Sequence, residues 1–252
     1  MALLRVDQWF ATLNTCSTFS AVLPDAGPVG EVPVVYLLHG VQDDGTGWLR
    51  FTAAERYARL YNVALVVPNA GNSFYAHMAA GPDYFAFVTE ELPAQCRRLF
   101  GLSGRREDNY VFGLSMGGYG ALKCALTYPE RYAGCAAFST AVRPAGLAHA
   151  EPSPLSPAEW RAVFGPRGEP GPECDLFALA GRAAGGDLPH IHMACGTGDP
   201  LYPDNLDLHR HLTEKGIRHT FRSRPGTHAW TLWDQELEYA LDAFFGTADT
   251  AG

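Results

Sequence analysis

The sequence has little positive charge and lacks any long apolar run. It holds 19 lysines and arginines against 27 aspartates and glutamates, which gives a net charge of −8 over 252 residues. This balance argues against nucleic acid and anionic membranes as partners, because both attract positively charged surfaces. No segment reaches the roughly 18 consecutive apolar residues that a membrane-spanning helix requires. We therefore expect neither a nucleic-acid partner nor a membrane partner.

Signals of secretion are also missing. The first seven residues include Arg5 and Asp7, so charge interrupts the segment before the apolar core of a signal peptide could form. The six cysteines are scattered, with no C-x-x-C pair: Cys16, Cys96, Cys124, Cys135, Cys174 and Cys195. This spacing favours small buried hydrophobes in a reducing compartment over a disulfide framework. The sequence thus predicts a cytoplasmic protein.

Strand-length apolar runs alternate with segments of helical periodicity along most of the chain. Buried strands are predicted at residues 33–38, 63–67, 110–112 and 132–139, and further strands of the sheet at 191–195 and 217–223. Helices are predicted at residues 51–61, 84–100 with a kink at Pro93, 116–128, 205–215 and 229–245. Residues 3–10 and 17–23 alternate apolar and polar positions and predict an antiparallel pair. The pattern predicts a single α/β domain over residues 1–252, with a mostly parallel central sheet and helices on both faces.

Residues 140–189 differ in composition from the rest of the chain. Prolines and glycines recur throughout this segment, and two short helical stretches stand near 157–164 and 174–183. A loop of this length in a compact domain is usually functional or disordered. We expect a functional segment, a lid-like cap inserted within the domain.

One motif carries most of the chemical information. Residues 113–117 read Gly-Leu-Ser-Met-Gly, a G-x-S-x-G pattern that follows an apolar strand and precedes small residues that open a helix. In this nucleophile elbow the strand turns into the helix within about two residues, so a Cβ at Gly113 or Gly117 would collide with neighbouring backbone. The turn would hold Ser115 in a strained conformation with its Oγ above the sheet edge. The motif predicts that Ser115 is a nucleophile.

A serine nucleophile needs a histidine base and an acid that orients it. The elbow favours the chain order serine, acid, histidine. His228 is the best base, because its Pro-Gly-Thr-His loop follows the last predicted strand at the carboxyl edge of the sheet. Asp199 directly follows another strand and is the best acid, with Asp204 and Asp207 as alternatives near the next helix. The other histidines after Ser115 fit surface or structural roles.

The oxyanion that forms when an ester carbonyl is attacked needs preset hydrogen-bond donors, each worth roughly 3 kcal/mol. The N–H of Met116, directly after the nucleophile, is one such donor. The second is expected in the loop after the strand at 33–38, which reads His39-Gly40-Val41. We assign the N–H of Val41, with that of Gly40 as the alternative. His39 precedes the serine and is expected to pack beneath this loop rather than to act as the base.

The sequence resembles the esterase D-like serine esterases, which include tributyrin (acetyl) esterases, S-formylglutathione hydrolases and, more distantly, mycolyltransferases and feruloyl esterases. The matching segments lie in order along most of the chain: 36–40, 83–85 with 91–93, the Ser-Met-Gly-Gly elbow at 113–120, 196–199, and 226–230 with Trp233. The tributyrin esterase branch is most similar, through its Phe-Tyr block at 74–75 and its Asp-Tyr-Phe block at 83–85.

The resemblance implies an α/β-hydrolase fold and matches the serine, aspartate and histidine assigned above to the family's catalytic triad. It also implies that Tyr75, Tyr84 and Trp230 line the acyl or alcohol pocket. By analogy with the family we expect a homo-oligomer. Residues 140–189 depart from the family pattern, and substrate choice often depends on such a segment.

These observations predict a serine carboxylesterase that hydrolyses short-chain acyl esters through a Ser115–His228–Asp199 triad and an acyl-enzyme intermediate, with no metal or cofactor. An S-formylglutathione hydrolase-type thioesterase is the alternative. Members of that type carry a cysteine-bearing segment after His-Gly, whereas this chain reads Val-Gln-Asp-Asp-Gly at residues 41–45. Acyl transfer to a sugar or lipid hydroxyl and a non-catalytic binding module are further alternatives.

Overall fold

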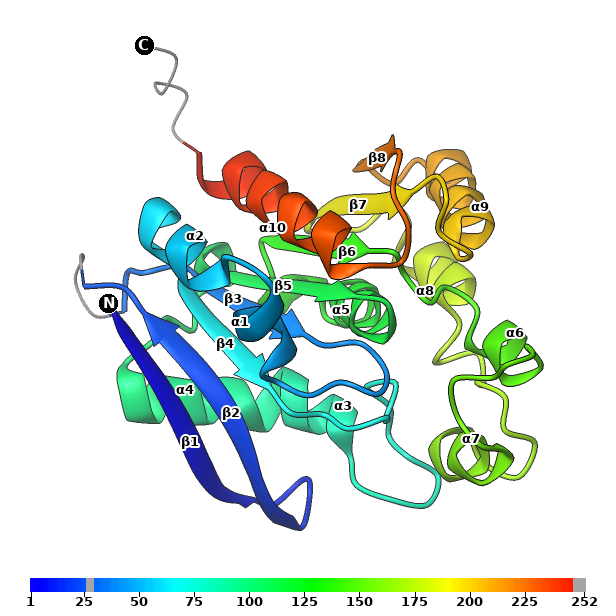
Figure 1. The fold of residues 1–252 in the computed structure, drawn as a ribbon, viewed down its shortest axis with the longest axis horizontal. Helices are drawn as coiled ribbons and strands as arrows, with labels where there is room; N and C mark the ends of the chain where they lie inside the picture. The colour runs from blue at the N-terminus through cyan, green and yellow to red at the C-terminus, as the bar shows by residue number, and fades with distance from the viewer. Residues whose placement is uncertain (26–29, 247–252) are drawn as a thin grey trace.

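Eight strands form one mixed sheet in the computed structural model, which describes residues 1–25 and 30–246 (Figure 1). The strands are β1 (Ala2–Phe10), β2 (Thr15–Leu23), β3 (Val34–Leu38), β4 (Ala64–Pro68), β5 (Asn109–Leu114), β6 (Gly134–Phe138), β7 (His190–Gly196) and β8 (His219–Arg224). Their order is β1-β2-β4-β3-β5-β6-β7-β8. The β1–β2 and β2–β4 pairs are antiparallel, and the remaining pairs are parallel. The predicted mostly parallel sheet with an antiparallel N-terminal pair is confirmed.

Helices cover both faces of this sheet (Figure 1). They are α1 (Gly47–Phe51), α2 (Ala54–Tyr61), α3 (Tyr84–Ala86), α4 (Leu92–Phe100), α5 (Met116–Thr127), α6 (Pro144–Ala148), α7 (Pro157–Phe164), α8 (Leu176–Ala183), α9 (Tyr202–Glu214) and α10 (Trp230–Phe245), with 3-10 turns at Arg106–Asp108 and Pro129–Arg131. Helices α1, α2 and α10 pack in the core on one face. Helices α4, α5, α8 and α9 pack in the core on the other.

Successive residues of the central strands enter opposite cores. In β3, Tyr36 and Leu38 pack on the side of α5, whereas Val35 and Leu37 pack on the side of α10. Every residue of β3 is buried, because helices cover both faces. This double burial explains the continuous apolar runs in the sequence. It also leaves the carboxyl ends of the parallel strands as one common edge where polar side chains can gather.

The helical stretch at 84–100 contains a π-helical turn, Phe87–Glu91, in place of the kink predicted at Pro93. Pro93 lies in the first turn of α4 and has no N–H to donate to the carbonyl of Thr89. The Thr89 carbonyl instead accepts a hydrogen bond from Arg131 Nη1 at 3.0 Å. The widened turn therefore accommodates the missing helical bond without a break.

The single helix predicted over 51–61 is divided into α1 and α2. Between them Thr52 adopts an extended backbone, and its Oγ1 accepts the N–H of Ala54 at 3.1 Å. The N–H of Ala53 donates to Asp234 Oδ1 at 2.8 Å, a contact that spans 181 residues of sequence. The break thus depends on a tertiary contact that periodicity alone does not reveal.

The segment 140–189 forms a packed cap that contains α6, α7 and α8. The predicted stretches at 157–164 and 174–183 correspond to α7 and α8, and α6 is an addition. Trp160 of α7 is buried and packs against Phe74, with ring centroids 5.0 Å apart. Helix α8 buries Leu176 against the core on the α5 side of the sheet. The cap is therefore part of the hydrophobic core.

All six cysteines are free thiols, and all but Cys16 are buried. Burial raises the pKa of the Cys96 and Cys124 thiols to about 12. Over residues 1–25 and 30–246, no helix has both the length and the apolar character needed to cross a bilayer.

The connection between β5 and α5 is so tight that it requires glycine at two positions. An ideal Cβ on Gly113 would lie 2.2 Å from the carbonyl oxygen of Gly117, and one on Gly117 would lie 2.1 Å from the carbonyl oxygen of Leu38. Both distances are far inside van der Waals contact, and the obstructing atoms are backbone. The collision expected from the motif is therefore present in the structure.

We predict that Gly117→Ala lowers the free energy of unfolding by several kcal/mol, because backbone must move to admit the methyl group. The matched control is Gly181→Ala in α8, where an added Cβ meets nothing within 4 Å. That control should raise the free energy of unfolding by about 0.5–1 kcal/mol. Urea denaturation followed by circular dichroism measures both, and equal effects of the two substitutions would contradict the prediction.

Candidate active site

Ser115 lies at the turn between β5 and α5 in a left-handed backbone conformation, with φ 53° and ψ −116°. Such a conformation costs a non-glycine residue on the order of 1–3 kcal/mol and persists only when its surroundings enforce it. Two backbone hydrogen bonds contribute here. The Ser115 N–H donates to the carbonyl of Phe138 at 2.8 Å, and the Ser115 carbonyl accepts the N–H of Ala141 at 3.1 Å. The segment that follows β6 therefore holds Ser115 from both sides.

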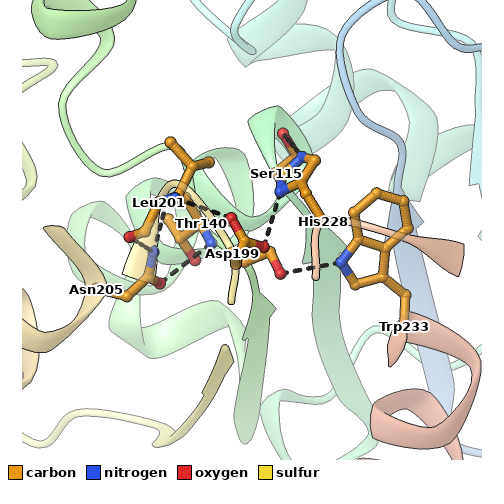
Figure 2. A network of polar contacts seen from close by, with 8 residues as sticks. Ser115, Thr140, Asp199, Leu201, Asn205, His228 and Trp233 are labelled. Carbon is orange, nitrogen blue, oxygen red and sulfur yellow. Dashed lines mark hydrogen bonds and ion pairs between the residues drawn. The ribbon is translucent and has the colours of Figure 1, made fainter. Parts of the chain in front are cut away.

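Three side chains from separate loops meet at the carboxyl edge of the sheet (Figure 2). His228 Nε2 lies 3.1 Å from Ser115 Oγ, and His228 Nδ1 lies 2.9 Å from Asp199 Oδ2. The Asp199 side chain is fully buried, whereas about a third of the His228 side chain is exposed. The structure thus brings together the serine, histidine and aspartate that the sequence singled out. A neutral imidazole in this arrangement donates from Nδ1 to the carboxylate and accepts from the hydroxyl through Nε2.

The surroundings of Asp199 keep it ionised although it is buried. Burial by itself raises the pKa of the carboxyl group, but the hydrogen bond and the charge of His228 outweigh burial and hold the pKa below its ordinary value. Hydrogen bonds from the Ser139 hydroxyl and the Leu201 N–H lower the pKa further. The Leu201 N–H lies 2.8 Å from Asp199 Oδ1. Asp199 is therefore an anion whose two oxygens both have partners.

Two residues without a predicted role, Ser139 and Trp233, also belong to this network. Trp233 Nε1 donates to Ser139 Oγ at 3.0 Å, and the indole stands perpendicular to the His228 ring with centroids 4.9 Å apart. Both side chains are buried, and Ser139 has φ 46°. Ser139 directly follows β6 at the same sheet edge as Asp199, which was the available sequence signal. Its hydrogen bonds depend on tertiary packing and could not be deduced from the sequence.

The loop after β3 is held from below by His39. The ring is fully buried, and burial lowers the pKa of its imidazole. His39 Nδ1 lies 2.7 Å from the carbonyl oxygen of Gly40, and its Nε2 accepts the N–H of Ala70 at 2.9 Å. In a trans peptide the N–H points away from the C=O. With the Gly40 carbonyl turned toward His39, the N–H of Val41 therefore points to the opposite side of the loop.

A cavity of about 540 Å³ opens onto the three side chains. Its walls come from the loop after β3, the cap and the loop after β7: Val41, Gln42, Ser115, Leu147, Pro152, Ser153, Pro154, Asp199, Pro200, Leu201 and His228. Apolar side chains dominate this lining. Among the described residues that form it, Asp199 and His228 are the titratable groups, and no lysine or arginine occurs. The described lining therefore offers no cationic side chain to pair with an anionic ligand.

The three aromatic residues expected to bind substrate lie away from this lining. Tyr75 is fully buried, and its hydroxyl donates to the carbonyl of His39 at 3.0 Å, so it supports the loop after β3 from within the core. Tyr84 lines a separate hollow beside α7. Trp230 packs against Trp48 with ring centroids 5.5 Å apart. The family motifs do not show which of these aromatic side chains pack in the core. The cap residues that line the cavity lie outside those motifs.

The alternative acids and bases have other partners. Asp204 and Asp207 form ion pairs with Arg143, at 2.5 and 3.3 Å. His209 Nδ1 lies 2.8 Å from His219 Nε2 at the far edge of the sheet. These side chains therefore belong to structural contacts, and the hydrogen-bonded set at the elbow stands apart from them.

A sheet of this order, with a serine at the strand–helix elbow and a histidine within hydrogen-bond distance, defines an α/β-type serine hydrolase. The esterase family described as "Putative esterase" matches residues 11–244. The chain belongs to this esterase family, within the esterase D-like group.

Three proteins to which the chain is similar, an acetyl esterase and two other hydrolases, agree with this assignment. The chain is 30% identical over 259 residues to an acetyl esterase of Caldicellulosiruptor saccharolyticus, covering 96% of this chain and 97% of the relative. The substrate-bound fluorophosphonate-binding serine hydrolase F (FphF) of Staphylococcus aureus is 29% identical, with a TM-score of 0.89 and coverage of 98% of this chain and 99% of the other. The S-formylglutathione hydrolase FrmB of Staphylococcus aureus is 29% identical, with a TM-score of 0.88 and coverage of 97% and 98%.

The lowered pKa of Asp199 predicts a pH-dependent contribution to stability. The folded protein binds fewer protons at this group than the unfolded chain, so the carboxylate stabilises the fold above its ordinary pKa of 3.8, and this contribution is lost as the pH falls below that value. We expect the difference in unfolding free energy between wild type and Asp199→Asn to be constant above about pH 5 and to shrink toward pH 3.

Urea denaturation at stepped pH measures this difference. The exposed Asp187 provides the control, and Asp187→Asn should show a smaller change over the same range, because exposed ion pairs contribute little. A difference for Asp199→Asn that stayed the same from pH 7 to pH 3 would contradict the prediction.

Proposed function

We propose that this protein is a carboxylesterase that hydrolyses short-chain acyl esters with Ser115 as nucleophile, His228 as general base and Asp199 as orienting acid. The observation that carries the proposal is the continuous hydrogen-bonded line from Ser115 Oγ through the imidazole to the buried carboxylate. A hydroxyl is a weak nucleophile until a base takes its proton, and this line places the imidazole so that Nε2 faces the hydroxyl and Nδ1 faces the carboxylate.

The proposed reaction has two halves. Ser115 Oγ attacks the ester carbonyl while His228 Nε2 takes its proton, and Asp199 stabilises the imidazolium that forms. The tetrahedral intermediate collapses, the alcohol leaves with the proton from His228, and an acyl-serine remains. Water then attacks the acyl group with His228 again as base, which releases the carboxylic acid and restores the serine.

Two backbone N–H groups are proposed to hold the oxyanion. Met116 is the first residue of α5, so its N–H has no intrahelical partner and lies at the positive end of the helix dipole. The N–H of Val41 is the second donor, because the contact between His39 and the Gly40 carbonyl turns the next N–H toward the cavity side. This geometry favours Val41 over Gly40. No metal or cofactor enters the proposed reaction.

The lining of the cavity supports a neutral oxygen ester as substrate. Its volume of about 540 Å³ and its apolar walls fit a short acyl group and a small alcohol. Glutathione carries two carboxylates, and the described lining offers no lysine or arginine to pair with them. The similarity to an acetyl esterase over nearly the whole chain agrees with this choice. A glutathione thioesterase remains the second candidate, because the FrmB structure is nearly as similar as that of FphF.

A cytoplasmic location also belongs to this proposal. The exposed Cys16 and the buried cysteines are all free thiols. Free thiols are typical of reducing compartments, whereas oxidising compartments favour disulfides. The homo-oligomer expected from the family stays a prediction.

Hydrolysis of p-nitrophenyl esters from acetyl to decanoyl tests the proposed activity. We expect the rate to peak at two to four acyl carbons and Ser115→Ala to lower kcat by at least about a thousandfold, since removal of one triad member leaves only binding and oxyanion stabilisation. Gly181→Ala serves as a substituted control with full activity. Equal rates for wild type and Ser115→Ala would contradict the role of Ser115.

Charge at the cavity wall tests the substrate class. We expect higher kcat/KM for p-nitrophenyl acetate than for S-formylglutathione. Leu147→Lys should raise kcat/KM for the anionic thioester about threefold, because one added charge near the ligand supplies a modest attraction in water. Leu147→Gln is the uncharged control, and neither variant should improve the neutral ester. Faster hydrolysis of S-formylglutathione by the wild type would instead favour the thioesterase.

A further inference from the structure

One buried side chain, Asn205 in the first turns of α9, joins two loops of the active site (Figure 2). Its carboxamide is fully buried and all of its hydrogen bonds go to backbone. Asn205 Oδ1 accepts the N–H of Thr140 at 3.1 Å, and Nδ2 donates to the Thr140 carbonyl at 2.9 Å and to the Leu201 carbonyl at 2.8 Å. The amide thus pairs with both backbone polar groups of Thr140 and with the carbonyl of Leu201, the residue at which the loop after β7 ends and α9 begins.

The two loops that Asn205 joins are those that hold the nucleophile and the acid. On one side, Thr140 lies between Phe138 and Ala141, whose backbone groups hold Ser115 at both its N–H and its carbonyl. On the other side, Leu201 donates its N–H to Asp199 Oδ1. Through Asn205, the segment that holds Ser115 is therefore connected by hydrogen bonds to the residue that holds the carboxylate.

A carboxamide matches the hydrogen-bonding groups at this site. Thr140 presents a donor and an acceptor side by side, and Leu201 presents a second acceptor. An aspartate would place a carboxylate oxygen against two carbonyls, and an alanine would leave the buried N–H of Thr140 without the Oδ1 acceptor. The carbonyls of Thr140 and Leu201 would keep only their bonds to the N–H groups of Val142 and Asn205. The Ser139 N–H, which donates to the carbonyl of Ala194 at 2.8 Å, and the Ser139 hydroxyl, which hydrogen-bonds Asp199, also join these segments, and Asn205 adds a separate bridge between them.

We propose that Asn205 is a positioning residue that fixes the Asp199 carboxylate relative to Ser115, and so sets the alignment of His228 between them. The inference rests on the proposed function, because it requires that Asp199 orient the base. Without the amide, the loops after β6 and β7 can move relative to each other. The carboxylate then no longer holds the imidazole in line with the serine hydroxyl, and the rate of the chemical step falls while substrate binding in the cavity is retained.

The first arm of the test is steady-state kinetics on p-nitrophenyl acetate with Asn205→Ala and with Asn205→Ser. The serine variant keeps one hydrogen-bond donor and should disturb folding less than the alanine variant. At a temperature well below the unfolding transition of every variant, kcat should fall at least about 10-fold and up to about 100-fold, with KM nearly unchanged. Asn109 supplies the matched control. It is also buried, and its Nδ2 donates to two backbone carbonyls, of Ser103 and Arg105, at the opposite end of β5.

Asn109→Ala and Asn109→Ser should lower the unfolding temperature as much as the Asn205 variants do, yet leave kcat at the wild-type value. If kcat fell with the unfolding temperature to the same extent in the Asn109 variants as in the Asn205 variants, the proposal would be overturned. Asn205 would then be a structural residue only.

The second arm is a double-mutant cycle with Asp199→Asn. A residue that acts through Asp199 has little left to lose once the carboxylate is gone, so Asn205→Ser should change kcat less than twofold in that background. An undiminished loss there would show that Asn205 acts by another route and would overturn the proposal. If Asp199→Asn itself left kcat unchanged, the proposed triad would fail, and that result is distinct from a failure of the Asn205 inference.

A spectroscopic signature completes the test. The His228 Nδ1 proton is held between imidazole and carboxylate, and it should give a low-field proton NMR signal that Asp199→Asn removes. Asn205→Ser should shift or broaden this signal, whereas Asn109→Ser should leave it in place. An unchanged signal in Asn205→Ser would contradict a positioning role.

Discussion

The strained turn at Ser115 is the constraint on which the site depends. A left-handed serine costs on the order of 1–3 kcal/mol, so the surrounding structure must enforce it. Backbone crowding at Gly113 and Gly117 allows only glycine there, and hydrogen bonds from the segment after β6 hold the serine N–H and carbonyl. The result is a hydroxyl raised above the sheet edge beside the first free N–H of α5. The proposed nucleophile and one proposed oxyanion donor are therefore placed by a single turn.

The parallel sheet positions the other two side chains, Asp199 and His228, because it brings the ends of distant strands to one edge. His228 lies 113 residues from Ser115 and 29 from Asp199, yet all three meet in hydrogen-bond distance. Burial of Asp199 strengthens its pull on the imidazole, and its hydrogen bonds keep it charged in spite of that burial. The cap then adds apolar walls from α6 and the chain beyond it. The proposed catalytic groups thus lie at the sheet edge, and the cap supplies part of the cavity wall beside them.

Strands and turns that have local causes can be predicted from the sequence, whereas contacts between distant segments cannot. Continuous apolar runs such as 33–38 and the elbow at 113–117 have local causes, and the strands and the turn follow from them directly. The positions of Asp199 and His228 follow from one rule about strand ends. By contrast, the division of the helix at 51–61 depends on Asp234, which lies 181 residues from its partner. The family resemblance predicts that aromatic residues such as Tyr75 contact substrate, but Tyr75 is buried in the core. Whether a side chain is buried depends on tertiary packing, which no local motif specifies.

The proposed mechanism requires that Ser115 be an activated nucleophile in the folded chain. The most direct measurement is reaction with a fluorophosphonate, followed by intact-mass analysis and peptide mapping. The proposed mechanism predicts one adduct per chain, located on Ser115. The rate of labelling should be strongly reduced in His228→Ala. A folded protein that took up no adduct, or carried it on another residue, would contradict the assignment of the active site.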